Sequence, residues 1–286
     1  MINKFYNKIS IGTANFGQIY SIDKIKVNKK EIFKILDVAK KNKINSIDTS
    51  QNYGASEKLI GEYIKKRKSK GWQITTKIIN EEKKIKNLIT QSKERLSIMP
   101  ANLLVHKSYH LTNDKFRKEL IDLKKRDKIK IGVSVYETSE INEVLEQFIP
   151  DIIQLPINIL NNKFFANDLL KRLKEKNIII QARSIFFQGL LFKKDNFIKS
   201  KHKKLYNLIK KLKIISKKNN ISLAELSLMF VNSIQEIDKI VIGVNTSVDL
   251  KNNIKICKKI LPKKILDEIL DTGINRLNFT KIIQNL

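Results

Sequence analysis

Two kinds of apolar segment alternate along the chain. Short runs rich in Ile, Val and Thr are separated by longer amphipathic stretches of Lys, Glu and Leu, a pattern typical of repeated strand and helix units. The first seven short runs begin 21 to 35 residues apart, the length that one strand, one crossover helix and two loops require. The pattern predicts eight strands, which open near Ile9, Ile44, Gln73, Asn102, Lys130, Asp151, Asn177 and Lys239.

Helical periodicity fills the intervals between these strands. Ser139, Ser222 and Ser247 are good N-cap residues at the starts of three of the stretches. The interval before the last strand is twice as long as the others and leaves room for an extra loop and helix. The predicted helices cover residues 30–42, 57–68, 82–96, 113–126, 139–148, 167–175, 202–218, 222–233 and 247–259, with a further helix at 263–271.

The absence of a linker and the even spacing indicate the fold class. No stretch rich in Pro, Gly or Ser interrupts the alternation, so we expect one domain over residues 1–286. Eight parallel strands could form an open sheet, but the loop from Gly12 to Gly17 does not carry the GxGxxG phosphate motif of such sheets. We therefore predict an α/β protein with a single (β/α)8 TIM barrel, an extra C-terminal helix and a tail.

Composition narrows the classes of partner. The chain has 286 residues, of which 42% are hydrophobic, enough to bury a sizeable core. Its 57 basic and 28 acidic residues give a net charge of +29, which would suit nucleic acid or an anionic membrane. The basic residues are mostly lysines spread along the whole chain, which favours compositional bias over a binding patch. We expect neither a nucleic-acid partner nor a membrane partner.

Cysteine usage and hydropathy indicate the compartment. Cys257 is the single cysteine, so an intramolecular disulfide and a cysteine cluster for a metal are both excluded. No apolar run approaches the roughly 18 residues that a membrane-spanning helix needs. The sequence therefore predicts a soluble, cytoplasmic protein.

Candidate chemistry lies where the strands end, because the active sites of such barrels lie at the carboxyl ends of their strands. The second strand ends in Asp48, with Tyr53 in the following loop, the third ends in Lys77 and the fourth in His106. Each residue alone has an ordinary structural explanation as a turn former, a surface ring or a solvated charge. Together they bring a carboxylate, a phenol, an ammonium and an imidazole to one rim.

These four groups are suited to proton transfer to an oxygen. A nearby Lys77 ammonium would lower the pKa of the Tyr53 phenol from its ordinary value of about 10, and Asp48 would be the counter-ion of Lys77. His106 could donate a hydrogen bond to a carbonyl oxygen. The set includes no nucleophile and no metal site, so we expect a cofactor to supply the electron pair, as a reduced nicotinamide does.

The stretch "SIDTSQNYGASEKLIG" and the segments "ITTKI" and "LLVHKS" resemble the aldo-keto reductase family, and the likeness extends over about residues 9–258. The resemblance implies an oxidoreductase that reduces an aldehyde or a ketone. It also implies that Asp48, Tyr53, Lys77 and His106 are the catalytic tetrad, with Tyr53 as the general acid. Members of the family bind NADPH in an extended form across the barrel mouth without a Rossmann domain.

Further segments resemble the cofactor-binding positions of the family. NADPH is the expected cofactor, and NADH is the alternative because a carboxylate at Asp249 would repel a 2′-phosphate. Ser134 and Gln154 would contact the nicotinamide carboxamide. The other cofactor-binding residues that the resemblance implies are Gly12, Thr13, Arg183, Ser184, Gln188, Gly189, Gly243, Thr246, Asp249 and Asn253.

Arg183 departs from the family, many members of which stack an aromatic ring on the nicotinamide at this point. The guanidinium would contact either the cofactor phosphates or an anionic substrate. The expected substrate is a small carbonyl compound such as a generic aldehyde or a sugar derivative, and the oligomeric state cannot be deduced. A non-catalytic nucleotide-binding regulatory subunit is the alternative function, against which the complete tetrad argues.

Overall fold

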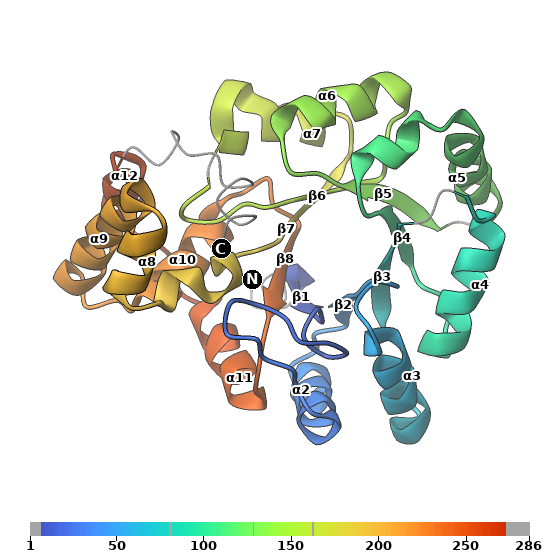
Figure 1. Ribbon diagram of the computed structural model, residues 1–286, viewed down its shortest axis with the longest axis horizontal. Helices are drawn as coiled ribbons and strands as arrows, with labels where there is room; N and C mark the ends of the chain where they lie inside the picture. Colours follow the sequence, from blue (N-terminus) through green and yellow to red (C-terminus); the bar gives the residue numbers. More distant parts are fainter. Residues whose placement is uncertain (1–6, 80–81, 128, 162, 273–286) are drawn as a thin grey trace.

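Eight parallel strands close into a barrel in this computed structural model, which describes residues 7–79, 82–127, 129–161 and 163–272. Each strand pairs with the next along the chain and the last pairs with the first (Figure 1). The predicted α/β barrel is confirmed. The strands are β1 (Ile9–Gly12), β2 (Ser46–Asp48), β3 (Gln73–Ile78), β4 (Asn102–Val105), β5 (Lys130–Ser134), β6 (Ile152–Leu155), β7 (Ile179–Ala182) and β8 (Lys239–Gly243).

The helices surround the barrel, as Figure 1 shows, and every helix that the periodicity predicted is present. Within the described residues, no helix is both long and apolar enough to cross a bilayer. The predicted helices form α2 (Lys29–Lys41), α3 (Ser56–Arg67), α4 (Ile85–Leu96), α5 (Asp114–Asp127), α6 (Thr138–Gln147), α7 (Leu169–Glu175), α9 (Lys203–Lys218), α10 (Leu223–Ser233), α11 (Ser247–Ile256) and α12 (Lys263–Leu270).

Short helices in the loops were not predicted. They are too short for an amphipathic period to be recognised in the sequence. The predicted tail, residues 273–286, lies outside the described residues. The additional short helices are α8 (Asp195–Lys201) and the 3₁₀ helices η1 (Ser108–Thr112), η2 (Lys163–Asp168) and η3 (Phe187–Phe192).

The helix caps show one confirmed prediction and two wrong ones. Ser222 caps α10, and its Oγ accepts from the Glu225 amide at 3.2 Å. The N-cap of α6 is Glu137 rather than Ser139, and that of α11 is Thr246 rather than Ser247. In both wrong cases an acidic residue in the first turn accepts hydrogen bonds from the cap's backbone, so the helix begins one or two residues earlier than predicted.

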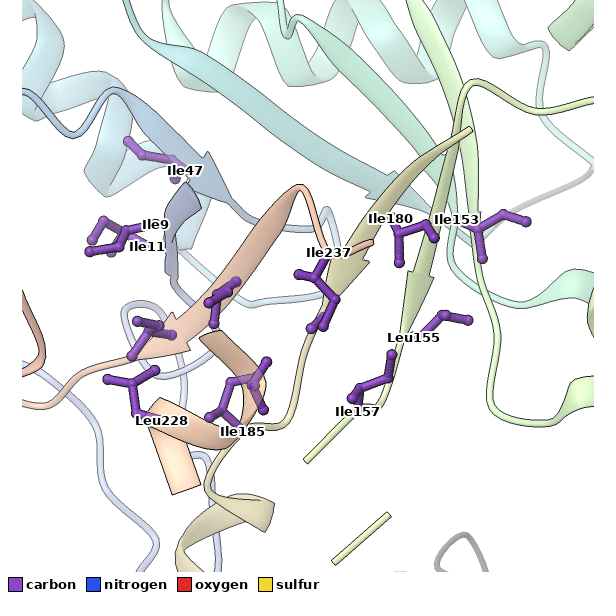
Figure 2. Close-up of a cluster of buried hydrophobic side chains, with 14 of the residues drawn as sticks. Ile9, Ile11, Ile47, Ile153, Leu155, Ile157, Ile180, Ile185, Leu228 and Ile237 are labelled. Atoms are coloured by element: carbon purple, nitrogen blue, oxygen red, sulfur yellow. The ribbon is translucent and has the colours of Figure 1, made fainter. Parts of the chain in front are cut away.

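The main core lies between the barrel and the helices. Side chains of alternate strand residues are buried in this outer layer, and Figure 2 shows part of it with Ile9 and Ile11 of β1, Ile47 of β2 and Ile153 of β6. Nearly complete burial of such side chains stabilises the fold by about 1.5–3 kcal/mol each. The outer layer therefore stabilises the closed barrel, and the side chains of the other strand residues point into the barrel interior.

Polar residues occupy much of the barrel interior. The hydroxyl of Ser46 donates to Ser10 at 3.0 Å, and the Asn102 amide donates to the Thr75 hydroxyl at 2.8 Å. The register aligns Gly12 with Asp48, so the strand ends meet at one rim. The inner face thus leads from bonded polar pairs up to the polar strand ends predicted to form the site.

Candidate active site

A cavity of about 720 Å³ opens at the carboxyl ends of the strands. Its wall contains the four predicted catalytic residues, Asp48, Tyr53, Lys77 and His106. The cavity therefore brings together groups from three strands and a loop, as the sequence led us to expect. It is also lined by most of the predicted cofactor-binding residues, namely Gly12, Thr13, Ser134, Gln154, Arg183, Ser184, Gln188, Gly189 and Gly243.

Lys77 and Asp48 form a buried ion pair in the floor of the cavity. The Lys77 Nζ lies 2.6 Å from Asp48 Oδ1, and the two side chains are 1% and 5% exposed. The ammonium also donates to the Thr49 carbonyl at 3.1 Å. Burial lowers the pKa of Lys77, and the pairing with Asp48 opposes that shift. The carboxylate is thus the main group that keeps a buried cation charged.

Tyr53 lies against both the cation and the imidazole. The Lys77 Nζ is 5.2 Å from the centre of the Tyr53 ring, and the His106 ring lies edge-on at 6.1 Å between centres. Burial, and after it the charge of Asp48, raises the pKa of Tyr53 above its ordinary value. The expected net lowering of this pKa is therefore wrong, because burial and the Asp48 carboxylate both disfavour the phenolate.

Two glycines hold the Tyr53 loop in place. A Cβ on Gly17 would lie 2.4 Å from the Tyr53 carbonyl oxygen and 2.2 Å from the Ser56 amide nitrogen. Gly54 has a φ of +54°, and a Cβ there would lie 2.7 Å from the Gly17 carbonyl oxygen. The loop after β1, which contains Gly17, and the loop between β2 and α3, which contains Tyr53, therefore pack backbone against backbone. Side chains at positions 17 and 54 would displace the phenol.

His106 is neutral in this site. Burial, followed by the charges of Lys77 and Arg183, lowers the pKa of His106 to about 3. Its Nδ1 lies 3.3 Å from the Ser50 hydroxyl. The imidazole therefore acts as a neutral hydrogen-bonding group at ordinary pH, and not as an imidazolium.

The low pKa of His106 predicts how stability depends on pH. An unfolded chain protonates histidine near pH 6.5 and the folded protein only near pH 3, so stability is lost as the pH falls through this interval. We expect the wild type to lose up to about 2 kcal/mol more than His106→Gln between pH 7.5 and pH 5. Urea unfolding of both proteins at the two pH values measures this, and equal losses would contradict the assignment.

Gln154 contacts the ion pair from β6. Its Nε2 donates to Asp48 Oδ2 at 2.7 Å and to Gln181 Oε1 at 3.0 Å. The side chain is fully buried, and its Oε1 has no hydrogen-bond partner among the described residues. An unpaired buried oxygen is costly, so this acceptor, on a residue that lines the cavity, is suited to a ligand with an amide N–H.

The start of α11 does not line the cavity, although the sequence predicted cofactor contacts at Thr246, Asp249 and Asn253. The Thr246 hydroxyl accepts from the Asp249 amide at 3.0 Å, and the Asp249 carboxylate accepts from the Thr246 amide at 2.9 Å. Glu31 of α2 also reaches this helix terminus, where Oε1 accepts from the Ser247 amide at 2.7 Å. Two carboxylates therefore occupy the first turn of α11.

The loop after β1 and the loop after β7 are bonded to each other on one side of the cavity. The Ile22 amide donates to the Gln188 carbonyl at 3.3 Å, and Asp23 forms an ion pair with Lys193. Gln188 has a positive φ of 54°, which bends the backbone after β7 towards the β1 loop. The two loops thus form a continuous border on this side of the cavity mouth.

Sequence reasoning did not identify several residues of the site. Tyr20 and Tyr136 line the cavity, Gln181 supports Gln154, and Ser50 contacts His106. The alternation of β7, which places Gln181 on the inner face, was a signal that could have found this residue. Tyr20 lies in an irregular loop, which gives no comparable signal.

The chain forms a parallel (β/α)8 barrel with a cluster of ionisable groups at its strand ends, and comparison with known proteins identifies its family. The sequence profile of the Aldo/keto reductase family matches residues 8–272. The chain therefore belongs to the aldo-keto reductases, a family of NAD(P)H-dependent oxidoreductases, as the motifs indicated. A comparison with curated proteins gives no match.

Solved structures share the fold. The holo form of the aldo-keto reductase AKR11C1 from Bacillus halodurans is 17% identical, covers 93% of this chain and 91% of its own, and gives a TM-score of 0.75. The protein PA4992 from Pseudomonas aeruginosa is 18% identical, covers 87% of this chain and 89% of its own, and gives a TM-score of 0.63. At these identities the likeness supports the architecture of the barrel alone.

Proposed function

We propose that this protein reduces an aldehyde or ketone by hydride transfer from a nicotinamide cofactor, with Tyr53 as the general acid. The observation that carries the proposal is the buried ion pair of Lys77 and Asp48 beside Tyr53 and His106, in one cavity at the strand ends. Family membership implies NAD(P)H-dependent carbonyl reduction in general.

The cavity has groups that fit a nicotinamide. The unpaired Oε1 of Gln154 can accept a hydrogen bond from the carboxamide, and the Ser134 hydroxyl lies in the same wall. Ser184, Gln188 and Gly189 lie beside them, where the resemblance predicts the phosphates. A reduced nicotinamide held by these residues would supply the hydride to the carbonyl carbon.

The side chains then have separate roles in proton transfer. The raised pKa of Tyr53 keeps the phenol protonated at neutral pH, so the acid form is the resting form. As the carbonyl oxygen gains negative charge, the O–H bond of Tyr53 breaks and the proton forms the alcohol. Lys77 stabilises the phenolate until water reprotonates it, and Asp48 holds Lys77 in position.

Ser50 can direct the hydrogen bond of His106. Its hydroxyl accepts from the Asn52 amide at 3.2 Å and lies 3.3 Å from His106 Nδ1. The same hydroxyl lies 3.2 Å from the Lys77 carbonyl, so its single proton goes either to that carbonyl or to Nδ1. When Ser50 donates to Nδ1, the proton of the neutral imidazole lies on Nε2, from which His106 can donate to the substrate oxygen. This hydrogen bond orients the carbonyl without a charged imidazolium.

The function is tested by two measurements on purified protein. Calorimetric titration with NADH and NADPH measures cofactor binding, and absorbance of the reduced nicotinamide follows turnover with a panel of aldehydes and ketones. We expect binding and substrate-dependent oxidation of the cofactor. Absence of cofactor binding would contradict the proposal, whereas binding without any turnover would support the regulatory alternative.

We also propose that NADH binds more tightly than NADPH. The resemblance places the adenosine end of the cofactor at the start of α11. There the Glu31 carboxylate accepts a hydrogen bond from the Ser247 amide, and the Asp249 carboxylate accepts one from the Thr246 amide. A 2′-phosphate would meet both carboxylates at amides that would otherwise favour an anion, and Lys34, 3.3 Å from Glu31, offsets only part of this negative charge. We expect the ratio of the two dissociation constants to favour NADH by about 10-fold, the effect of a charge-assisted contact.

Glu31→Gln tests this proposal without an activity assay. It removes one charge while keeping an acceptor for the Ser247 amide, so we expect the affinity for NADPH to rise several-fold and that for NADH to stay unchanged. Glu62→Gln on neighbouring α3, which alters an ion pair with Lys29, is the matched control. Equal changes for both cofactors would show that Glu31 acts on the stability of the helix terminus and not on selection.

A further inference from the structure

The charged groups in the cavity wall are not balanced. Among the described residues, the cavity-wall cations Arg183 and Lys107 have no acidic partner. The acidic residues of the wall are all engaged: Asp48 with Lys77, Asp23 with Lys193, Glu137 with Lys163, and Glu140 with the Ser108 hydroxyl and the backbone amides of Tyr136 and Glu137.

Neutral groups hold the Arg183 guanidinium in a defined position. Its Nε donates to Ser134 Oγ at 3.2 Å, one terminal nitrogen to Ser184 Oγ at 3.3 Å and the other to the Val135 carbonyl at 3.2 Å. Its Cζ lies 4.1 Å from the centre of the Tyr136 ring, a stacking distance. The guanidinium is thus fixed by four contacts, none of which neutralises its charge.

The remaining donors of Arg183 match a two-oxygen anion. A guanidinium has five N–H groups, and the three hydrogen bonds leave one N–H on each terminal nitrogen without a partner among the described residues. A carboxylate accepts two such parallel bonds. Burial is the largest cause of the pKa shifts of Tyr53 and His106. The charge of Arg183 opposes the rise of the Tyr53 pKa and adds to the fall of the His106 pKa, so the cation acts where the carbonyl would react.

We propose that Arg183 binds a carboxylate of the substrate, so that the substrate is an aldehyde or ketone that carries a carboxylate group. The inference rests on the proposed function and adds the chemical class of its substrate. The guanidinium fork fixes the anionic end, and Tyr53 and His106 receive the carbonyl end. The cofactor pyrophosphate is the competing anion, because Ser184 and Gln188 lie on the loop that follows Arg183.

A pair of aldehydes that differ in charge tests the proposal by kinetics. We compare 4-carboxybenzaldehyde with its methyl ester, using the wild type, Arg183→Leu and Arg183→Lys. The wild type should prefer the carboxylate in kcat/KM by about 10-fold or more, the size of a hydrogen-bonded charge contact. Arg183→Leu should abolish the preference, measured as the ratio of the two kcat/KM values within the same variant, while Arg183→Lys should retain part of it, because lysine keeps the charge without the fork.

Lys107→Leu is the matched control for the overall positive charge. This lysine lies in the same wall but is exposed, with its Nζ 5.7 Å from the centre of the Tyr109 ring. Screening by solvent should limit its effect on the preference to about threefold. Loss of the preference in Lys107→Leu, together with its retention in Arg183→Leu, would overturn the assignment to Arg183.

Equilibrium binding separates this inference from the proposed function. Calorimetry measures benzoate and the isosteric neutral benzamide with the cofactor-bound protein, and fluorescence measures NADH and NADPH. We expect Arg183→Leu to lose benzoate affinity while both cofactors bind within about threefold of wild type. Arg183-dependent binding of benzoate without any turnover would support the anion site at Arg183 and contradict the proposed function.

The opposite outcomes overturn the inference alone. If turnover is normal and the two aldehydes are used equally by wild type and Arg183→Leu, the substrate carboxylate is not bound by Arg183. If Arg183→Leu loses cofactor affinity by 10-fold or more and its benzoate affinity is unchanged, the guanidinium binds the pyrophosphate. Equal affinity of wild type for benzoate and benzamide likewise contradicts the proposal.

Discussion

Replacement of Tyr53 by phenylalanine is expected to reduce kcat/KM for carbonyl reduction by about 100- to 10,000-fold, the usual contribution of a positioned general acid. The change removes one hydroxyl and keeps the ring that contacts Lys77 and His106. Cofactor affinity should therefore stay within about twofold of wild type. Because the hydroxyl acts in the transition state, kcat and kcat/KM should fall together, as steady-state kinetics with a saturating cofactor can measure.

Tyr20→Phe is the matched control for this prediction. Tyr20 lines the same cavity, and burial, followed by the charge of Tyr53, raises its pKa to about 12. It has no Lys77 contact comparable to that of Tyr53, so its loss should reduce kcat/KM by less than about fivefold. A large loss in Tyr20→Phe together with an active Tyr53→Phe would transfer the role of proton donor to Tyr20.

The architecture could be predicted from the sequence because it repeats. Each strand and helix unit carries its own hydrophobic period, and eight such units leave few arrangements other than a barrel. The grouping of Asp48, Lys77 and His106 could be predicted for the same reason, since each ends a strand and the register brings these ends to one rim. The local pattern therefore determines which groups meet.

The energetic relations within the site could not be predicted in this way. The bond between Gln154 and Asp48 joins residues 106 positions apart, and that between Ser247 and Glu31 joins residues 216 positions apart. Neither has a signature in the neighbouring sequence. The direction of the Tyr53 pKa shift depends on burial and, after it, on the nearby charge of Asp48, and both are properties of the assembled cavity.

The ion pair that serves this chemistry should also dominate the response of stability to mutation. Lys77→Met leaves the Asp48 carboxylate buried without its cation, and Asp48→Asn leaves a buried ammonium without its anion. Removing one partner of a buried pair typically costs about 3–5 kcal/mol. We expect each single variant to lose this much in the free energy of unfolding, measured by urea denaturation at pH 7.

The double variant Asp48→Asn/Lys77→Met decides whether these losses come from an unpaired charge. With both charges absent, Gln154 can still donate a hydrogen bond to the side-chain amide at position 48. The free energy of unfolding of the double variant should therefore be at least that of the less stable of the two single variants. Additive losses would instead show that each side chain contributes through packing alone. Since all three variants should be inactive, recovery of stability without recovery of turnover would show that this pair is retained for proton transfer at a cost to the fold.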